Sequence, residues 1–384
     1  MRNIFIIGSK GIPSKYGGFE TFVDKLTEYK MSKEIKYHVA CLGNNEQEFE
    51  YNDARCFNIK VPQMGSARAI LYDLKALNKV YNYIKQNSVE NPIVYILACR
   101  IGPFIKIYQK KFNELGVPIL LNPDGHEWKR AKWSAPVRAY WKLSERMMIK
   151  YTDLAICDSK AIQQYIIEDY VKYQPQTTFI AYGATVSEPH TRDHQLYCEW
   201  LEKWSVSANN YYLIVGRFVP ENNYELMIKE FMASDTKKSL IIVTNVENNK
   251  FYIDLKKKTG FEKDPRIKFV GTIYNQELLY EVRINAFGYL HGHEVGGTNP
   301  SLLEALATTP LNLLLDVAFN KEVGGDAGLY FKKENNSLSD LISLADVLTT
   351  KDIQKKEFMA KKRIHDEYSW DIIVKKYETI FLGV

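Results

Sequence analysis

Short runs of apolar residues recur along the first half of the chain, and segments with the helical spacing of apolar positions separate them. Five runs fit buried strands: residues 4–7, 37–42, 93–98, 117–121 and 154–157. Residues 72–84 and 105–115 show the helical spacing. Strands that alternate with helices predict a parallel sheet covered by helices. Ligands of such sheets bind beyond the carboxyl ends of the strands.

The same alternation returns in the second half, after a polar segment at 185–210 that has the composition of a linker. Its strand-like runs are residues 211–215, 240–244, 267–270, 286–290 and 311–315. A run at 180–184 predicts the last strand of the first half, and Ser369 is a suitable cap for an amphipathic C-terminal helix. We therefore expect an α/β protein with domains at residues 1–187 and 188–368 and a terminal helix at 369–384.

Composition and charge narrow the class of protein. A length of 384 residues suits two domains, and 46% hydrophobic with 25% charged residues is typical of a soluble globular protein. The net charge of +5 permits attraction to phosphates or to an anionic membrane without implying nucleic acid. The five cysteines are scattered without a Cys-x-x-Cys pair, which argues against disulfides and a zinc site and favours a reducing cytosol. The sequence shows no signal peptide and no apolar run of membrane-spanning length, so we expect any membrane contact to be peripheral.

A glycine loop connects the strand at 286–290 to a helix. Gly296 and Gly297 allow a sharp turn and the close approach of a ligand, and Asn299 is a suitable cap for a helix that starts with proline. The amides of Thr298 and of the first helical turn would then face an anion such as a phosphate. Glu304 follows in an apolar run, where a ribose edge or a cation would satisfy a buried carboxylate. The alternative is an ordinary loop before an amphipathic helix, with Glu304 in solvent.

Three other loops follow predicted strands and carry candidate residues. Gly17 and Gly18 lie in a long loop that lacks the dinucleotide-binding spacing and could close over a ligand between two domains. Arg217 follows the strand at 211–215 and would share one sheet edge with the helix start at Asn299, so that both grip one diphosphate; the alternative is a surface arginine. The third loop places Asp124, His126, Glu127 and Trp128 within a few residues, a set suited to a polar sugar, or else it is a simple Pro-Asp-Gly turn.

A cationic and aromatic segment follows the third loop. Its candidate membrane or acceptor contacts are Trp128, Lys129, Arg130, Lys132 and Trp133. Cationic groups interleaved with interfacial aromatics suit the headgroups of an anionic membrane or a lipid-linked phosphate. Nucleic acid would also accept such a surface. The alternative is a solvated helix whose aromatic residues face the core.

These motifs together resemble a known family. Gly17-Gly18, Gly216-Arg217, the helix ending in Glu-Ala-Leu-Ala and the terminal Ser-Trp-Asp resemble the retaining GT-B glycosyltransferases related to glycogen synthase. The motifs Gly-Gly-Phe-Glu-Thr-Phe, Glu-Trp-Lys-Arg-x-Lys-Trp, Gly-Arg-Phe-x-Pro-Glu-Asn-Asn and His-Gly-His-x-Val-Gly-Gly-Thr-Asn-Pro-Ser resemble the bacterial polysaccharide rhamnosyltransferase branch. The resemblance covers nearly the whole chain.

The resemblance implies two Rossmann-like domains that face each other across a cleft, with the C-terminal helix crossing back to the first. It implies transfer of rhamnose from dTDP-rhamnose, with retention, to a lipid-linked saccharide such as glucose on a polyprenyl diphosphate, in capsule or cell-wall synthesis. The expected location is the cytoplasmic face of the plasma membrane, as a peripheral protein with no cofactor and no nucleic-acid partner. The implied catalytic residues are Asp124, His126, Glu127 and Arg217. The implied substrate-binding residues are Gly17, Gly18, Arg217, Asn222, Gly297, Thr298, Asn299 and Glu304.

The sequence departs from the broader family at two points. Asn222 and Asn223 occupy the region of a lysine, and Gly296 stands where a second glutamate is usual, with Glu294 nearby but out of step. No Asp-x-Asp occurs, so we expect no metal site and expect charge on the leaving diphosphate to be met by Arg217 and helix-end amides. A nucleotide-sugar epimerase of the same fold and an inactive nucleotide-sugar or lipid-binding subunit remain alternatives.

Overall fold

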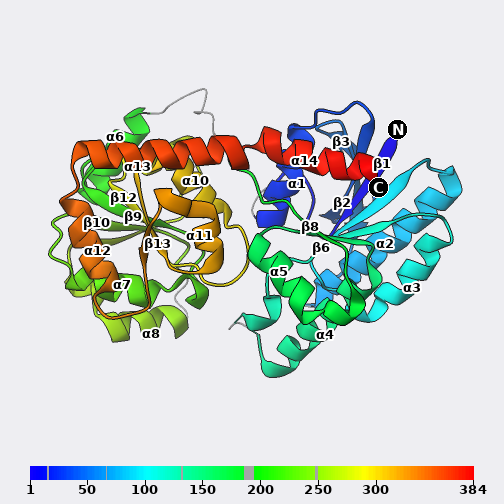
Figure 1. Cartoon of the computed structure of the whole chain (residues 1–384), viewed down its shortest axis with the longest axis horizontal. Helices are drawn as coiled ribbons and strands as arrows, with labels where there is room; N and C mark the ends of the chain where they lie inside the picture. Colours follow the sequence, from blue (N-terminus) through cyan, green and yellow to red (C-terminus); the bar gives the residue numbers. More distant parts are fainter. Residues whose placement is uncertain (15–16, 66, 131–132, 186–193, 247–249) are drawn as a thin grey trace. The chain divides into compact units, whose positions relative to one another are not determined.

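The computed structural model describes residues 1–14, 17–65, 67–130, 133–185, 194–246 and 250–384. The chain divides into two compact units, and each contains one sheet covered by helices (Figure 1). Unit 1 comprises Met1–Gly183 and Trp370–Val384, and unit 2 comprises Ala184–Ser369.

Unit 1 is built on an eight-stranded sheet in the order β3-β4-β2-β1-β5-β6-β7-β8. All neighbouring strands are parallel except β3, which is antiparallel to β4. The strands are β1 (Arg2–Ile7), β2 (Ile35–Gly43), β3 (Glu48–Tyr51), β4 (Ala54–Lys60), β5 (Pro92–Leu97), β6 (Ile119–Asn122), β7 (Leu154–Cys157) and β8 (Thr177–Phe179). The helices are α1 (Gly18–Glu28), α2 (Ala67–Asn87), α3 (Gly102–Asn113), η1 (Glu127–Lys129), α4 (Ala135–Tyr151), α5 (Lys160–Asp169), η2 (Val171–Tyr173) and α14 (Trp370–Gly383).

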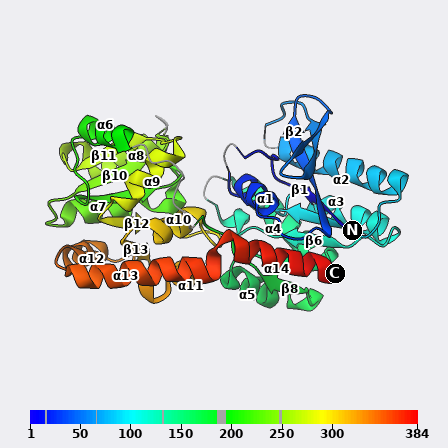
Figure 2. The same ribbon diagram turned by 90° about the horizontal axis from the view of Figure 1, so that it is seen from above.

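Helices cover both faces of this sheet because successive strand residues point to opposite faces and both sets are apolar. Phe5 and Val94 pack on one face with α2, α3, α4 and α5. On the other face, the ring of Phe22 in α1 contacts that of Tyr377 in α14, with a centroid distance of 5.0 Å. The C-terminal helix therefore completes the core of unit 1, and the two chain ends lie side by side (Figure 2), with the Arg2 guanidinium donating to the carbonyl of Val384 at 2.6 Å.

Unit 2 has a six-stranded, fully parallel sheet in the order β11-β10-β9-β12-β13-β14. The strands are β9 (Tyr211–Val215), β10 (Ser239–Val243), β11 (Ile267–Gly271), β12 (Gly288–His291), β13 (Leu311–Leu315) and β14 (Leu329–Phe331). The α-helices are α6 (His194–Trp204), α7 (Tyr224–Ala233), α8 (Lys250–Thr259), α9 (Gln276–Ile284), α10 (Pro300–Thr308), α11 (Ala318–Gly324), α12 (Ser337–Asp346) and α13 (Thr350–Arg363). The short segments are η3 (Pro220–Asn222), η4 (Phe261–Lys263), η5 (Gly325–Ala327) and the π-helical turn η6 (Ile364–Tyr368).

The alternation along β9 shows how this sheet is covered. Tyr212 and Ile214 pack with α7, α8 and α12, whereas Tyr211 and Leu213 pack with α6 and α9 on the opposite face. Because helices cover both faces of each sheet, we expect ligands to bind at the ends of the strands, as in other α/β folds.

One strand prediction was wrong in unit 1, and two strands were missed. The run at 180–184 is buried but is not a strand, although the amide of Ile180 donates to the carbonyl of Cys157 in β7 at 2.9 Å; the last strand is β8, three residues earlier. Strands β3 and β4 were not predicted, and β3 makes the sheet mixed rather than purely parallel.

Candidate functional site

Two loops of unit 2 leave the same edge of its sheet. Strands β9 and β12 are parallel neighbours, with Leu213 paired to Tyr289. The loop with Gly216 and Arg217 follows β9, and the loop from Gly292 to the start of α10 follows β12. Since the carboxyl ends of parallel strands lie at one edge, the two predicted diphosphate-binding elements meet there.

Hydrogen bonds tie these two loops together. The Asn222 amide donates to the carbonyl of Arg217 at 2.6 Å, and its oxygen lies 2.7 Å from Nδ1 of His293. Asn223 donates to the carbonyl of Gly292 at 2.7 Å. The two asparagines that replace the family lysine therefore fix the backbone around Arg217, a positioning function that the sequence did not reveal.

The first turn of α10 lies at the end of β9. The Asn299 side chain accepts from the amide of Ser301 at 2.9 Å, and Pro300 is the first helical residue. The Ser301 hydroxyl donates to the carbonyl of Val215, the last residue of β9, also at 2.9 Å. The start of α10 is therefore bonded to the residue two positions before Arg217. The loop before it turns at Gly296, whose φ of +123° suits glycine. Gly297 and Thr298 are buried in this turn.

Arg217 is an exposed cation at this edge. Within the described part of the chain, its guanidinium makes no hydrogen bond or ion pair with another side chain. A helix N-terminus carries a partial positive charge. The edge therefore carries an exposed guanidinium and the positive end of α10, a combination suited to a di- or monophosphate.

Glu304 does not occupy the buried position that its apolar neighbours suggested. Its side chain is 47% exposed, and its carboxylate lies 2.5 Å from the guanidinium of Arg283, which is 4% exposed. Arg283 comes from α9 and was not predicted, because nothing in its local sequence indicates a partner 21 residues later. Glu304 is thus partly engaged by a cation and partly open to solvent.

The predicted sugar-binding loop of unit 1 has an unusual backbone. Asp124 and His126 adopt positive φ angles of 60° and 45°, and Ala98, which follows the neighbouring strand β5, has a φ of 71°. Left-handed conformations are costly for residues other than glycine and cluster at functional sites. The amide of Asp124 donates to Asn122 at 2.9 Å, which helps to hold the turn.

Burial and neighbouring charges shift the pKa values of Asp124 and His126 in this loop. Burial raises the pKa of Asp124, with a further upward contribution from Glu127, while Arg130 lowers it. Burial and the nearby Lys129 and Lys142 lower the pKa of His126 to about 4. His126 is therefore a neutral imidazole at pH 7, and its ring lies 4.2 Å from that of Tyr165.

The cationic and aromatic segment is largely engaged within unit 1. Arg130 forms an ion pair with Glu127, and the Trp133 indole donates to the same carboxylate at 2.9 Å. Trp128 is half-buried beneath the ammonium of Lys142, which lies 4.5 Å from its ring centre. Lys129 is exposed, and Lys132 lies outside the described residues.

The glycine loop of unit 1 is held against α1. Gly17 caps α1 with a φ of +129°, and a Cβ there would meet the Glu20 carboxylate at 1.9 Å, so only glycine fits. The same carboxylate accepts from the amide of Lys10 at 2.7 Å. Gly18 is exposed at the helix start with free space around it.

Among the described residues, no group of three or more His, Cys, Asp or Glu side chains is placed to hold a metal ion.

Comparisons with known proteins support the fold. Residues 1–185 match the model of a family described as a domain of unknown function (DUF1972), and no curated protein matches the chain. A glycosyltransferase from Rickettsia africae and a sucrose-phosphate synthase from Thermosynechococcus elongatus each share 14% identity and a TM-score of 0.74, over 100% of this chain and 98% and 100% of theirs. The Anabaena protein HepE, solved in complex with UDP, shares 12% identity and a TM-score of 0.69 over the full length of both chains. At this identity the similarity shows the fold, and it confirms the prediction that the chain has the GT-B glycosyltransferase fold of two Rossmann-like units.

Proposed function

We propose that this protein is a retaining glycosyltransferase whose nucleotide-sugar donor binds at the carboxyl edge of the unit 2 sheet. The observation that carries the proposal is the exposed Arg217, which makes no ion pair among the described residues and lies two residues after Val215, the residue bonded to the capped start of α10. The UDP complex of the structural neighbour HepE supports a nucleoside diphosphate as the ligand class.

In the proposed reaction, the acceptor hydroxyl attacks the anomeric carbon from the face of the leaving group. The bond between that carbon and the diphosphate oxygen breaks, a glycosidic bond forms, and the hydroxyl proton passes to the leaving phosphate. Arg217 and the amides near Thr298 stabilise the negative charge that develops on the diphosphate, since preorganised electrostatics is usually the largest catalytic contribution. The exposed side of the Glu304 carboxylate accepts the ribose hydroxyls while Arg283 holds the other side.

The finer assignment follows the sequence resemblance. We propose dTDP-rhamnose as the donor and a saccharide on a polyprenyl diphosphate as the acceptor, at the cytoplasmic face of the membrane. Asp124, His126 and Glu127 would contact the transferred sugar. The neutral imidazole of His126 suits hydrogen bonding to a hydroxyl, because it can donate from one nitrogen and accept at the other.

The test is incubation of the pure protein with a panel of nucleotide sugars, with and without a lipid-diphosphate glucose, followed by mass spectrometry. A glycosylated lipid from dTDP-rhamnose, with retained anomeric configuration, is the expected product. Conversion of the donor without acceptor would indicate an epimerase, and nucleotide binding without any product would indicate a binding subunit. A covalent sugar adduct on Asp124 or Glu127 would overturn the proposed direct attack of the acceptor from the face of the leaving group.

A further inference from the structure

The outer sides of α3 and α4 in unit 1 expose large apolar side chains. Phe104, Ile107 and Leu143 are 40%, 58% and 41% exposed. The rest of each helix packs normally, since Ile105, Phe112 and Met148 are buried in the core. The exposed side chains therefore lie on a face that nothing in unit 1 covers.

Every exposed charged residue within these two helices is a cation. They are Lys106, Lys110, Arg138, Arg146 and Lys150. Glu145 is the one acidic residue in either helix, and it is buried, where it accepts from the hydroxyl of Tyr165 at 2.5 Å. The exposed surface of the two helices thus combines apolar groups with positive charge, and the first residue after α3 is the exposed, acidic Glu114.

These five cations have no acidic partner among the described residues, and this distinguishes them from a similar helix elsewhere. Helix α8 also exposes an apolar residue, Ile253, and a lysine cluster. There, however, Lys256 pairs with Glu262 at 2.6 Å and Lys258 pairs with Glu225 at 2.9 Å. Two lysines of α8 therefore have acidic partners, whereas the five exposed cations of α3 and α4 have none among the described residues.

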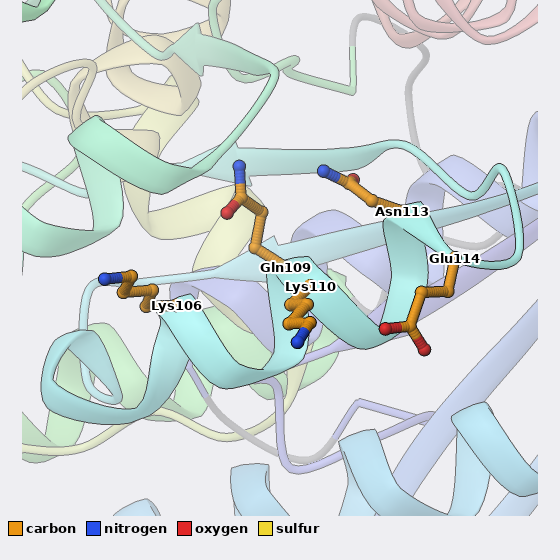
Figure 3. A pocket seen from close by; sticks show the side chains of 5 residues that line it. All are labelled: Lys106, Gln109, Lys110, Asn113 and Glu114. Carbon is orange, nitrogen blue, oxygen red and sulfur yellow. The ribbon is translucent and has the colours of Figure 1, made fainter.

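The two helices form one surface because they pack directly on each other. The amide of Gly102 donates to the hydroxyl of Ser144 at 2.7 Å, and a Cβ on Gly102 would lie 2.3 Å from the Ser144 carbonyl oxygen. A shallow groove runs along α3, lined by Lys106, Gln109, Lys110, Asn113 and Glu114 (Figure 3). Lys106 and Lys110 are one helical turn apart, a spacing that lets both contact one anionic headgroup.

We propose that this α3–α4 surface binds the anionic face of a lipid bilayer. Apolar side chains would enter the headgroup boundary while the lysines and arginines contact lipid phosphates, the usual pattern of an interfacial helix. The surface ends at α5, where Glu168 and Asp169 are exposed. No helix among the described residues is long and apolar enough to cross a membrane. This inference deepens the proposed function, because it brings the enzyme to a lipid-linked acceptor.

The test is co-sedimentation of the full chain with vesicles of phosphatidylcholine alone or mixed with phosphatidylglycerol. Wild-type protein is expected to bind the anionic vesicles and to dissociate as salt rises. Replacing Lys106, Lys110 and Arg146 with glutamine should weaken binding at least about tenfold, since each lysine or arginine near the surface adds to the attraction of anionic lipid. Phe104→Ser with Ile107→Ser should also weaken it. The matched control on α8, Ile253→Ser with Lys256→Gln and Lys257→Gln, should bind as wild type.

Binding that is absent, that is equal on neutral vesicles, or that survives both sets of α3–α4 substitutions would overturn the proposal. Circular dichroism and the melting temperature identify any variant that fails to fold, and the two independent variant sets keep the test decisive. Transfer to a short-chain, water-soluble acceptor separates this proposal from the proposed function. The variants should retain that transfer, whereas vesicle binding without any transfer by wild type would contradict only the proposed function.

Discussion

Arg217 and Glu304, the two side chains proposed to bind the nucleotide, have different neighbours in unit 2. Arg217 is exposed and unpaired among the described residues, so removing it leaves no group unsatisfied. Glu304 neutralises Arg283, which is buried. A loss of activity in Arg217→Ala would therefore report the loss of a ligand contact alone. A loss of activity in Glu304→Ala would combine the loss of a ligand contact with the loss of the Arg283 ion pair.

We predict that Glu304→Ala lowers the free energy of unfolding by about 1 kcal/mol, because it leaves a buried guanidinium without its carboxylate. Arg217→Ala should change it by less than about 0.5 kcal/mol. Urea denaturation of the two variants measures both values. Equal stabilities would mean that the Arg283–Glu304 pair contributes nothing to folding.

Two buried histidines predict how stability depends on pH. Burial lowers the pKa of His38 and of His291 from 6.5 to about 3. The unfolded chain binds these protons more readily, so stability should fall as the pH drops below about 6.5 and continue to fall towards 3. At pH 5 each histidine should cost about 2 kcal/mol relative to pH 8. His291→Asn should flatten this dependence in denaturation experiments, whereas His365→Asn, at a site with a 73% exposed side chain, should not. An unchanged pH dependence of stability in His291→Asn would contradict the lowered pKa of His291.

Among the elements, α10 contributes its N-terminus both to the fold of unit 2 and to the proposed donor site. Asn299 caps the helix by accepting from Ser301, and the Ser301 hydroxyl ties that turn to β9. The cap and the anion site can be separated, because aspartate caps a helix as well as asparagine but carries a negative charge.

We predict that Asn299→Ala lowers the free energy of unfolding by about 1 kcal/mol through loss of the cap. Asn299→Asp should keep the stability but weaken nucleoside diphosphate binding by about tenfold, because it places a carboxylate beside the phosphates. Thermal melts and calorimetric titration with dTDP measure the two effects. Unchanged affinity in Asn299→Asp would place the ligand elsewhere.

Some elements were predictable from the sequence for a physical reason. Strands β7, β9 and β13 begin and end where the apolar runs do, since strands buried on both faces are continuous apolar runs. Strand β3 was missed because its Glu-Phe-Glu-Tyr sequence lies exposed at the sheet edge. The run at 180–184 was misassigned because an apolar run indicates burial but does not show what buries it. Gly183 packs on the Trp370 ring rather than joining the sheet.

The candidate site likewise contains features that the sequence predicted and contacts that it did not. The cap at Asn299 and the glycine turn are local, so the sequence predicted them. The contacts of Asn222 with His293 and of Glu304 with Arg283 join segments that meet only in the folded sheet, so no local pattern indicated them.

At the scale of the whole molecule, the C-terminal helix completes a unit that begins at residue 1. The Glu378 carboxylate in α14 accepts from the amide of Met31 at 2.9 Å, and the Tyr377 and Phe381 rings pack against Tyr95 of β5. Residues 370–384 must therefore be in place before unit 1 has its full core.

We predict that ending the chain after Ser369 destabilises unit 1 while unit 2 keeps its stability. Hydrogen exchange should accelerate in β1, β2 and β5, whose α14-facing side would be uncovered, and remain unchanged in β9 and β12. Gly383→Ala, at a position with free space around it, is the control that should leave exchange unchanged. Protected β1 amides in the shortened chain would contradict the prediction.

The most direct test of the proposed donor site is calorimetric titration of dTDP and UDP into wild-type protein, Arg217→Ala and Lys257→Ala. Lys257 is an exposed cation near the C-terminal end of α8. Wild type and Lys257→Ala should bind at least one nucleotide with equal affinity, and Arg217→Ala should bind it at least about tenfold more weakly, the loss of a charge-assisted phosphate contact. Binding of neither nucleotide by wild type, or equal affinity in Arg217→Ala, would contradict a nucleoside diphosphate site at this edge.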